Sequence, residues 1–129
     1  MVKRETIVAK GLFPRVSRSS AVRVGDLIWT AGLSGDDAKT GKVTGDIKEQ
    51  TRKVLENLKI LLEESGSSMK SVVNVSVYLA NMHDRAAMNE VYREFFPPDQ
   101  NPPTRKSFGG VDIEEGILLE IDAVAIAER

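Results

Sequence analysis

The segment 45–66 reads GDIKEQTRKVLENLKILLEESG and carries the clearest local signal in the chain. Asp46 has a helix-capping side chain, and Glu49 lies three residues later, which is the spacing of a capping box. Apolar residues then recur at helical spacing, while charged residues populate the other faces. These apolar residues are Ile47, Val54, Leu55, Leu58, Leu61 and Leu62. The pattern predicts an amphipathic helix that begins at Asp46 and ends near Gly66.

The segments on either side of this helix are typical of β-strands. Gly25-Asp26 separates two apolar runs and predicts a tight hairpin turn. After the helix, Val72–Leu79 is rich in β-branched residues and alternates Val73, Val75, Val77 and Leu79 with polar positions, as a half-buried strand does. Before the helix, strands are predicted at Thr6–Ala9, Ala21–Val24 and Leu27–Leu33.

A second helix is predicted to begin at Asp84 and to end at Pro97-Pro98, because proline cannot continue a helix. Its inward residues are Met88, Val91, Tyr92 and Phe95. Thr104–Phe108 and Ile117–Ile126 then form the closing strands. The resulting order, βββαβαββ, predicts an α+β fold in which two helices cover one face of a mixed sheet. With 129 residues, we expect one domain spanning residues 1–129.

The last strand is apolar on both faces. Ile117, Leu119, Ile121, Ala123 and Ala125 line one face, and Leu118, Val124 and Ile126 make the other face apolar too. Two helices cover only one face of the predicted sheet. We therefore expect an oligomer in which sheets of neighbouring copies pack together.

The composition excludes several classes of function. Lys and Arg number 18 against 19 Asp and Glu, and aromatic residues make up 5%, so neither charge nor stacking surface favours nucleic-acid binding. The absence of cysteine excludes disulfides and thiolate chemistry. No stretch has the eighteen or so apolar residues of a membrane span. We expect a soluble, cytoplasmic protein that binds neither nucleic acid nor membrane.

Arg105 is the first candidate for a binding residue. It follows Pro102-Pro103-Thr104, and its planar guanidinium is suited to holding a carboxylate through two parallel hydrogen bonds. Taken alone, the same residue also fits a solvated arginine on a strand.

Glu120 and Asp122 lie within the second apolar face of the last strand. A carboxylate among apolar neighbours costs free energy unless it is paired or hydrogen-bonded. Two interpretations fit Glu120. It is either a structural acid at the rim of the sheet, or a group that positions water or accepts a proton beside the Arg105 site.

Other kinds of site find little support. Gly32-Leu33-Ser34-Gly35 lacks the glycine spacing of a nucleophile elbow, and the single histidine, His83, is assigned to the turn before the second helix. One histidine without cysteine also leaves only scattered acids for a metal. We expect no metal site.

Several of these segments together resemble one family. The stretch GDLIWTAG at 25–32, the block Thr44–Leu62, the strand and helix from Val72 to Phe96, Pro103-Thr104-Arg105 and Leu119-Glu120-Ile121 are similar to the RidA (YjgF) family of reactive-intermediate deaminases. The resemblance covers nearly the whole chain. It implies a chorismate-mutase-like fold and a homotrimer with sheets packed into a central barrel and with three clefts at subunit interfaces. It also implies hydrolysis of enamines and imines, such as 2-aminoacrylate and its 2-imino acid tautomer, to 2-keto acids and ammonia, without a cofactor.

The resemblance also implies roles for individual residues. Arg105 matches the arginine that holds the substrate carboxylate, and Glu120 matches the acid that positions the attacking water. Asn89 and Gly32 match residues that line the cleft. Ser107 lies where archetypal members have a cysteine that contacts the substrate mainly through its backbone.

Two cleft positions depart from the archetypal pattern. Arg18 aligns near a tyrosine of the family, and Ala31 takes the place of a serine. Together with Arg15 and Lys106, Arg18 adds positive charge, which suits either solvation or a second substrate carboxylate, as in 2-aminomuconate. Two further functions stay open: a non-catalytic protein that binds 2-keto acids at Arg105, and a ribonuclease or translation inhibitor, which the charge balance does not favour.

Overall fold

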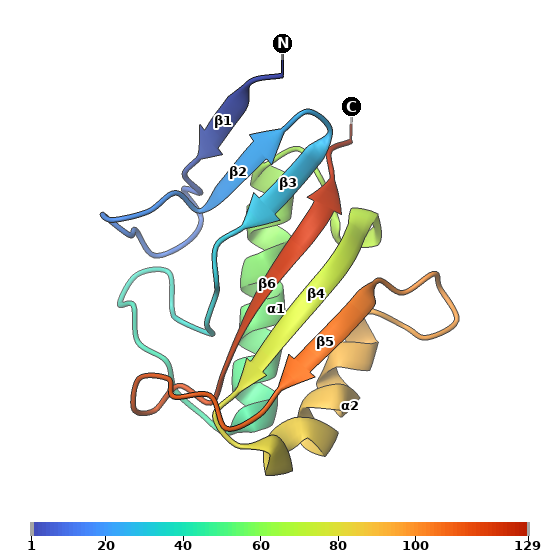
Figure 1. Ribbon diagram of the computed structural model, residues 1–129. Coiled ribbons are helices and arrows are strands. Elements are labelled where there is room, and N and C mark those ends of the chain that lie inside the picture. The colour runs from blue at the N-terminus through green and yellow to red at the C-terminus, as the bar shows by residue number, and fades with distance from the viewer. Residues whose placement is uncertain (1, 129) are drawn as a thin grey trace.

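A six-stranded β-sheet with two α-helices on one face forms the framework of the protein (Figure 1). The computed structural model describes residues 2–128. The strands are β1 (Arg4–Ile7), β2 (Ala21–Val24), β3 (Leu27–Thr30), β4 (Val72–Leu79), β5 (Thr104–Phe108) and β6 (Leu119–Ile126). The helices are α1 (Ile47–Glu64) and α2 (Arg85–Phe95), and the 3₁₀ turns Met69–Ser71 and Met82–Asp84 precede β4 and α2. The predicted α+β class and the order of elements are confirmed.

The strands lie in the order β1-β2-β3-β6-β4-β5. Neighbours are antiparallel except β4 and β5, which are parallel. Parallel strands need a crossover connection, and α2 provides it on the way from β4 to β5. In Figure 1 both helices lie behind the sheet, α1 along its middle and α2 close to β5. The sheet is therefore mixed, as predicted.

The predicted capping box begins α1. The Glu49 backbone N–H donates to Asp46 Oδ1 (2.9 Å), and the Asp46 backbone N–H donates to Glu49 Oε1 (3.2 Å). All six predicted apolar positions of α1 are buried. Three polar side chains of α1 are buried beside them, namely Gln50, Thr51 and Asn57.

Two predicted strands end or begin elsewhere because side chains replace their ladder hydrogen bonds. The first strand ends at Ile7 and not at Ala9, since the Ala9 N–H donates to Ser20 Oγ (2.9 Å). The last strand begins at Leu119 and not at Ile117, since the Leu118 N–H donates to Gln50 Oε1 (2.9 Å). Hydrogen bonds to side chains outside these strands thus make both strands shorter at that end than predicted.

The predicted strand Leu27–Leu33 is interrupted by a bulge. Trp29 pairs with Val124, and Leu33 forms an isolated bridge with Ile121, so three residues on one side face two on the other. The Thr30 hydroxyl replaces a backbone acceptor of the ladder: the N–H of Ala123 on β6 donates to Thr30 Oγ1 (3.0 Å). The bulge turns residues 31 and 32, which are both predicted site residues, out of the ladder between β3 and β6.

A second bulge makes the predicted alternation of β4 wrong at the start of the strand. Val73 was expected on the same face as Val75, yet it is exposed while Val72 is buried. The register against β6 shifts between Val72 and Asn74, so one extra residue reverses the direction of the first side chains.

The sheet face opposite the helices exposes large apolar side chains. Trp29 pairs with Val124 on this face, because its neighbour Ile28 points to the helices and is fully buried. Exposed hydrophobics of the central and flanking strands are Val24, Leu27, Trp29, Val73, Phe108 and Ile126, each at least 37% exposed. The expectation that apolar side chains also line the second face of the sheet is confirmed.

Candidate active site

Arg105 lies on the helix side of the sheet. It pairs with Val75 of β4, whose side chain is fully buried beneath the helices. Its guanidinium carbon is 4.6 Å from the ring centroid of Tyr92 on α2, a cation–π geometry. Within residues 2–128 the Arg105 guanidinium has no carboxylate partner and donates no hydrogen bond. Its N–H donors are therefore not committed to other groups of the described chain.

The environment of Arg105 is electropositive and partly desolvated. Burial lowers the pKa of Arg105, and the neighbouring charges of Arg85 and Arg93 lower it further, while Tyr92 opposes them. Arginine nevertheless stays protonated in proteins. Burial also raises the pKa of Tyr92 to about 12, against the influence of the Arg105 charge. The tyrosine is thus neutral and the arginine charged near neutral pH, as a carboxylate site requires.

Three buried oxygen atoms near Arg105 in the fold have no protein hydrogen-bond partner. They are Asn89 Oδ1, Tyr92 OH and Ser107 Oγ. Ser107 follows Arg105 by two residues on the same face of β5, and Asn89 precedes Tyr92 by about one helical turn on α2. An unsatisfied buried polar atom costs roughly 1–3 kcal/mol, so each of these atoms needs an explanation, and a bound ligand would supply the missing partner. Two of the predicted site residues, Asn89 and Ser107, thus flank Arg105.

Glu120 lies on the opposite face of the sheet, where it lines a pocket with Arg18, Ala31 and Gly32. A Cβ at Gly32 would lie 3.4 Å from Glu120 Oε1, at contact distance, and would fill the space in front of the carboxylate. Arg18 donates from Nη2 to the Gly32 carbonyl oxygen, 3.1 Å away. The bulge after β3 makes this contact possible because it turns that carbonyl out of the ladder.

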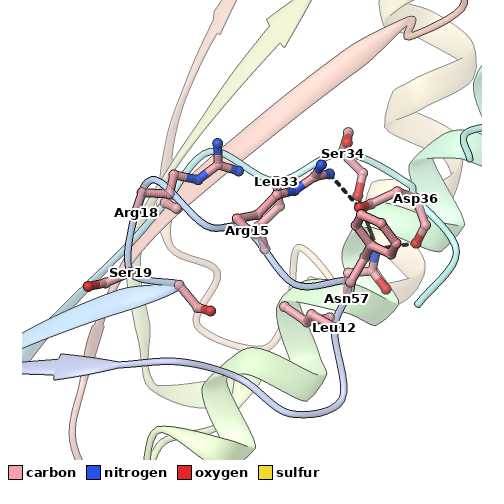
Figure 2. Close-up of a pocket in the computed structure, with 11 residues that line it drawn as sticks. Leu12, Arg15, Arg18, Ser19, Leu33, Ser34, Asp36 and Asn57 are labelled. Carbon is pink, nitrogen blue, oxygen red and sulfur yellow. Dashed lines mark hydrogen bonds and ion pairs between the residues drawn. The ribbon is translucent and has the colours of Figure 1, made fainter. Parts of the chain in front are cut away.

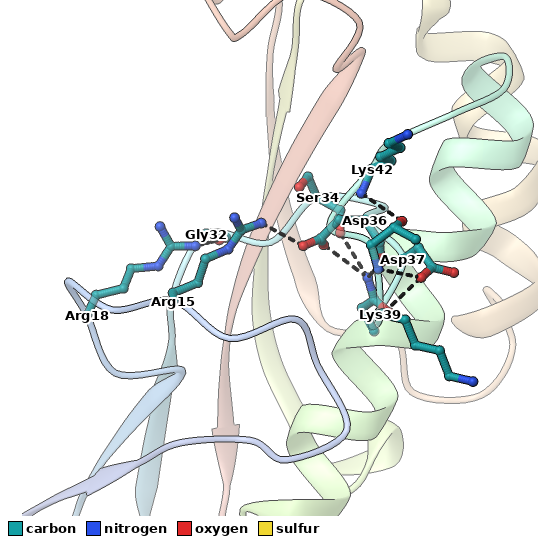
Figure 3. Close-up of polar contacts among 10 residues, drawn as sticks. Arg15, Arg18, Gly32, Ser34, Asp36, Asp37, Lys39 and Lys42 are labelled. Atoms are coloured by element: carbon teal, nitrogen blue, oxygen red, sulfur yellow. Dashed lines mark hydrogen bonds and ion pairs between the residues drawn. The ribbon is translucent and has the colours of Figure 1, made fainter.

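The loop that carries Gly32 is held by contacts that the sequence did not reveal (Figure 2). Arg15 Nη2 lies 2.6 Å from Asp36 Oδ2, and Asn57 Nδ2 donates to the carbonyl oxygens of Ser34 (3.0 Å) and Asp36 (3.1 Å). Figure 3 shows that these contacts form a row from Arg18 across to the turn at Asp37. Asn57 therefore holds segment 34–36 of this loop against α1.

Gln50 of α1 holds the segment before Glu120 through similar hydrogen bonds. Its Nε2 donates to the Gly116 carbonyl oxygen (3.0 Å), and its Oε1 accepts the Leu118 N–H. Gln50 and Asn57 are seven residues apart, which places both on the apolar face of α1. Two amides on an otherwise apolar stripe were the signal in the sequence that these residues hold loops.

The register shows why the two candidate catalytic residues are separated within one chain. Arg105 pairs with Val75 and Glu120 pairs with Tyr78, three positions further along β4. An odd separation places side chains on opposite faces of a sheet. Three residues along the strand and two strands across correspond to roughly 14 Å between their Cα atoms. The chain brings Arg105 together with Ser107 and Asn89, and Glu120 together with Gly32, Ala31 and Arg18.

Within the described part of the chain, no group of three His, Cys, Asp or Glu side chains is arranged to hold a metal ion. Likewise, no helix in residues 2–128 is long and apolar enough to cross a membrane.

Comparison with known proteins defines the class. The family described as endoribonuclease L-PSP matches residues 11–127. A RutC family protein of Pyrococcus abyssi is 40% identical over 129 residues, covering 99% of this chain and 100% of the relative. The 2-iminobutanoate/2-iminopropanoate deaminase of Dermatophagoides farinae is 33% identical and covers 85% of each chain. The solved structure of Escherichia coli TdcF with bound serine is 27% identical, with a TM-score of 0.87, and covers 96% of this chain and 99% of TdcF. The chain belongs to the RidA (YjgF) family.

Proposed function

We propose that this protein hydrolyses reactive enamines and 2-imino acids to 2-keto acids and ammonia. The observation that carries this proposal is Arg105, a partly buried arginine whose donors have no partner in the described chain. It lies near unsatisfied polar atoms, and the charges of Arg85 and Arg93 act on it. The names of similar proteins, among them the mite 2-iminobutanoate/2-iminopropanoate deaminase, support the reaction class.

The chemistry asks little of the protein beyond orientation. 2-Aminoacrylate converts to its 2-imino tautomer, and water adds to the electrophilic carbon of the C=N bond. The carbinolamine then expels ammonia and leaves the 2-keto acid. Arg105 holds the substrate carboxylate, and Glu120 positions the water and accepts its proton. No metal or organic cofactor takes part in this scheme.

The proposed site needs two copies of the chain. Arg105 and Glu120 point to opposite faces of one sheet, roughly 14 Å apart at their Cα atoms, so one small imino acid cannot contact both in a single chain. We propose that a neighbouring copy covers the apolar face around Trp29 and Ile126, and that its edge strand β5 places its own Arg105 beside the Glu120 pocket. We propose the homotrimer implied by the family, with three such interfacial sites.

The first test is the rate of keto-acid formation from 2-aminoacrylate generated in solution, with the wild-type protein and its Arg105→Ala variant. Loss of one charge-assisted contact of about 1.5–3 kcal/mol should lower kcat/KM roughly ten- to a hundredfold while the fold persists. Full activity in Arg105→Ala would refute the carboxylate role. A wild-type protein that binds 2-keto acids without accelerating hydrolysis would instead be a metabolite-binding protein.

One observation favours a second candidate, a substrate with an additional anionic group. Arg15 is neutralised by Asp36, but Arg18 contacts only the neutral carbonyl of Gly32 and has no ion pair among residues 2–128. Its remaining donors face the same pocket as Glu120, although Glu114 also lines that pocket and opposes an anion. A dicarboxylic 2-imino acid is therefore the alternative substrate class.

A further inference from the structure

We propose that Tyr92 is a positioning residue, whose ring fixes the plane of the Arg105 guanidinium so that its donor edge is presented to the substrate carboxylate. This inference rests on the proposed function. The guanidinium carbon is 4.6 Å from the ring centroid. A ring that lies against the flat face of a guanidinium leaves its five N–H donors free, because all of them lie in the guanidinium plane. The tyrosine therefore restrains the arginine without consuming the hydrogen bonds that a ligand needs.

Tyr92 is itself held rigidly enough for this role. Its side chain is only 7% exposed, and its ring packs against that of Phe96 with centroids 4.9 Å apart. Two ion pairs fasten α2 to α1, at Lys48–Glu90 (2.5 Å) and Arg52–Glu94 (2.8 Å). The ring is thus part of the framework.

The surroundings of Arg105 make such a restraint necessary. The charges of Arg85 and Arg93 act on Arg105, and their repulsion raises the free energy of the guanidinium at this place. An arginine side chain also has many rotamers, and ordering it during binding reduces affinity. The negative face of the Tyr92 ring attracts the cation and offsets both effects.

The test compares Tyr92→Phe, which keeps the ring, with Tyr92→Leu, which removes it. The affinity for 2-oxobutanoate, a monocarboxylate product analogue, is measured by calorimetry beside KM and kcat for 2-iminobutanoate. Tyr92→Leu should raise Kd and KM roughly three- to thirtyfold, the range of a cation–π contact, with a smaller change in kcat. Tyr92→Phe should stay within about twofold of wild type in both constants.

A cycle with Arg105→Ala separates positioning from structure. If Tyr92 acts through Arg105, Tyr92→Leu should have no further effect on Kd in the Arg105→Ala background. Phe95→Leu removes an aromatic side chain from the same helix and serves as the control for lost packing. Tyr92→Met, whose longer unbranched side chain can adapt to the space left by the ring, replaces Tyr92→Leu if thermal unfolding shows that the leucine variant is not folded.

Several results would overturn the inference. Equal losses in Tyr92→Phe and Tyr92→Leu would assign the effect to the hydroxyl, and an added loss in the Arg105→Ala background would assign it to packing. Absence of 2-oxobutanoate binding by the wild type would remove the inference together with the carboxylate site. Binding without hydrolysis would overturn only the proposed reaction, because the Kd values still decide the role of Tyr92.

Discussion

The two halves of the proposed site are built in different ways. Around Arg105, regular elements do the positioning: β5 carries the arginine, and the buried ring of Tyr92 on α2 faces it. Around Glu120, loops form the pocket, and their backbone carbonyls are held by side chains from elsewhere. In the proposed site, the rigid half would bind the carboxylate that all substrates share, and the loop-lined half would differ between relatives. We therefore propose that Arg105 binds the carboxylate and that Arg18 and Ala31 set specificity.

Residues that are assigned to one site from the sequence need not lie together within one protomer. Arg105 and Glu120 belong to next-neighbour strands, yet the register places them on opposite faces. Oligomers that combine an Arg105 variant with a Glu120 variant test this separation most directly.

The largest expected effect is recovery of activity in mixed oligomers of Arg105→Ala and Glu120→Gln. Glu120→Gln alone should lower kcat roughly 10²- to 10⁴-fold, as loss of a general base does, and Arg105→Ala alone should keep a tenth or less. After the two are unfolded and refolded together in equal amounts, about a quarter of the interfaces in a random mixture combine an intact Arg105 with an intact Glu120. The mixture should therefore recover about a quarter of the wild-type activity.

Two controls accompany the mixing experiment. The same variants mixed without unfolding should not gain activity on the timescale of the assay. A refolded mixture with only the average activity of its two components would show that both residues serve one site within a single chain, or that Glu120 has no catalytic part.

The sequence was sufficient for the framework because its signals are local. Asp46 and Glu49 form the predicted capping box, and Pro97-Pro98 lies directly beyond the end of α2. The alternation of the last strand correctly assigned Leu119, Ile121, Ala123 and Ala125 to the buried face. It was wrong before the strand begins, because Leu118 packs against the core and Ile117 lines the pocket with Glu120. Such features depend on neighbours within a few residues, so they can be recognised without knowing the tertiary structure.

The pairing of strands could not be read in the same way. The bulges at Thr30 and Val73 depend on contacts with β6, which is distant in sequence, and each reverses the alternation of side chains beyond it. The sequence correctly placed Glu120 on the second face of the last strand, but that Arg105 lies on the other face follows only from the register. Tyr92 was predicted only as an inward residue of the second helix, because a cation–π contact between α2 and β5 has no local pattern.

A smaller effect is expected from Arg18→Gln, which tests whether the loop-lined half sets specificity. The ratio of kcat/KM for 2-iminosuccinate to that for 2-iminobutanoate should fall about three- to tenfold, since one exposed charge-assisted contact is lost. Arg23→Gln is the matched control, because Arg23 also donates to a glycine carbonyl, that of Gly25 (2.9 Å), outside the pocket. An equal ratio in wild type and Arg18→Gln would mean that Arg18 is simply solvated.

The smallest effect concerns the two tyrosines of the chain, one in each half. Burial is the main cause that raises the pKa of Tyr78, helped by its 3.0 Å hydrogen bond to Asp122, and burial raises the pKa of Tyr92 to about 12. A phenol whose pKa is raised in the folded state stabilises the protein below its unfolded pKa of about 10, and this contribution is lost as pH rises through the folded pKa. Phenolate absorbance should therefore show little ionisation until above pH ~10 in the folded protein. Stability measured by denaturant unfolding should fall between about pH 10 and 12, less so in Tyr92→Phe. Ionisation of both tyrosines near the value of free tyrosine would contradict the buried positions of these rings and, with them, the rigid support given to Arg105.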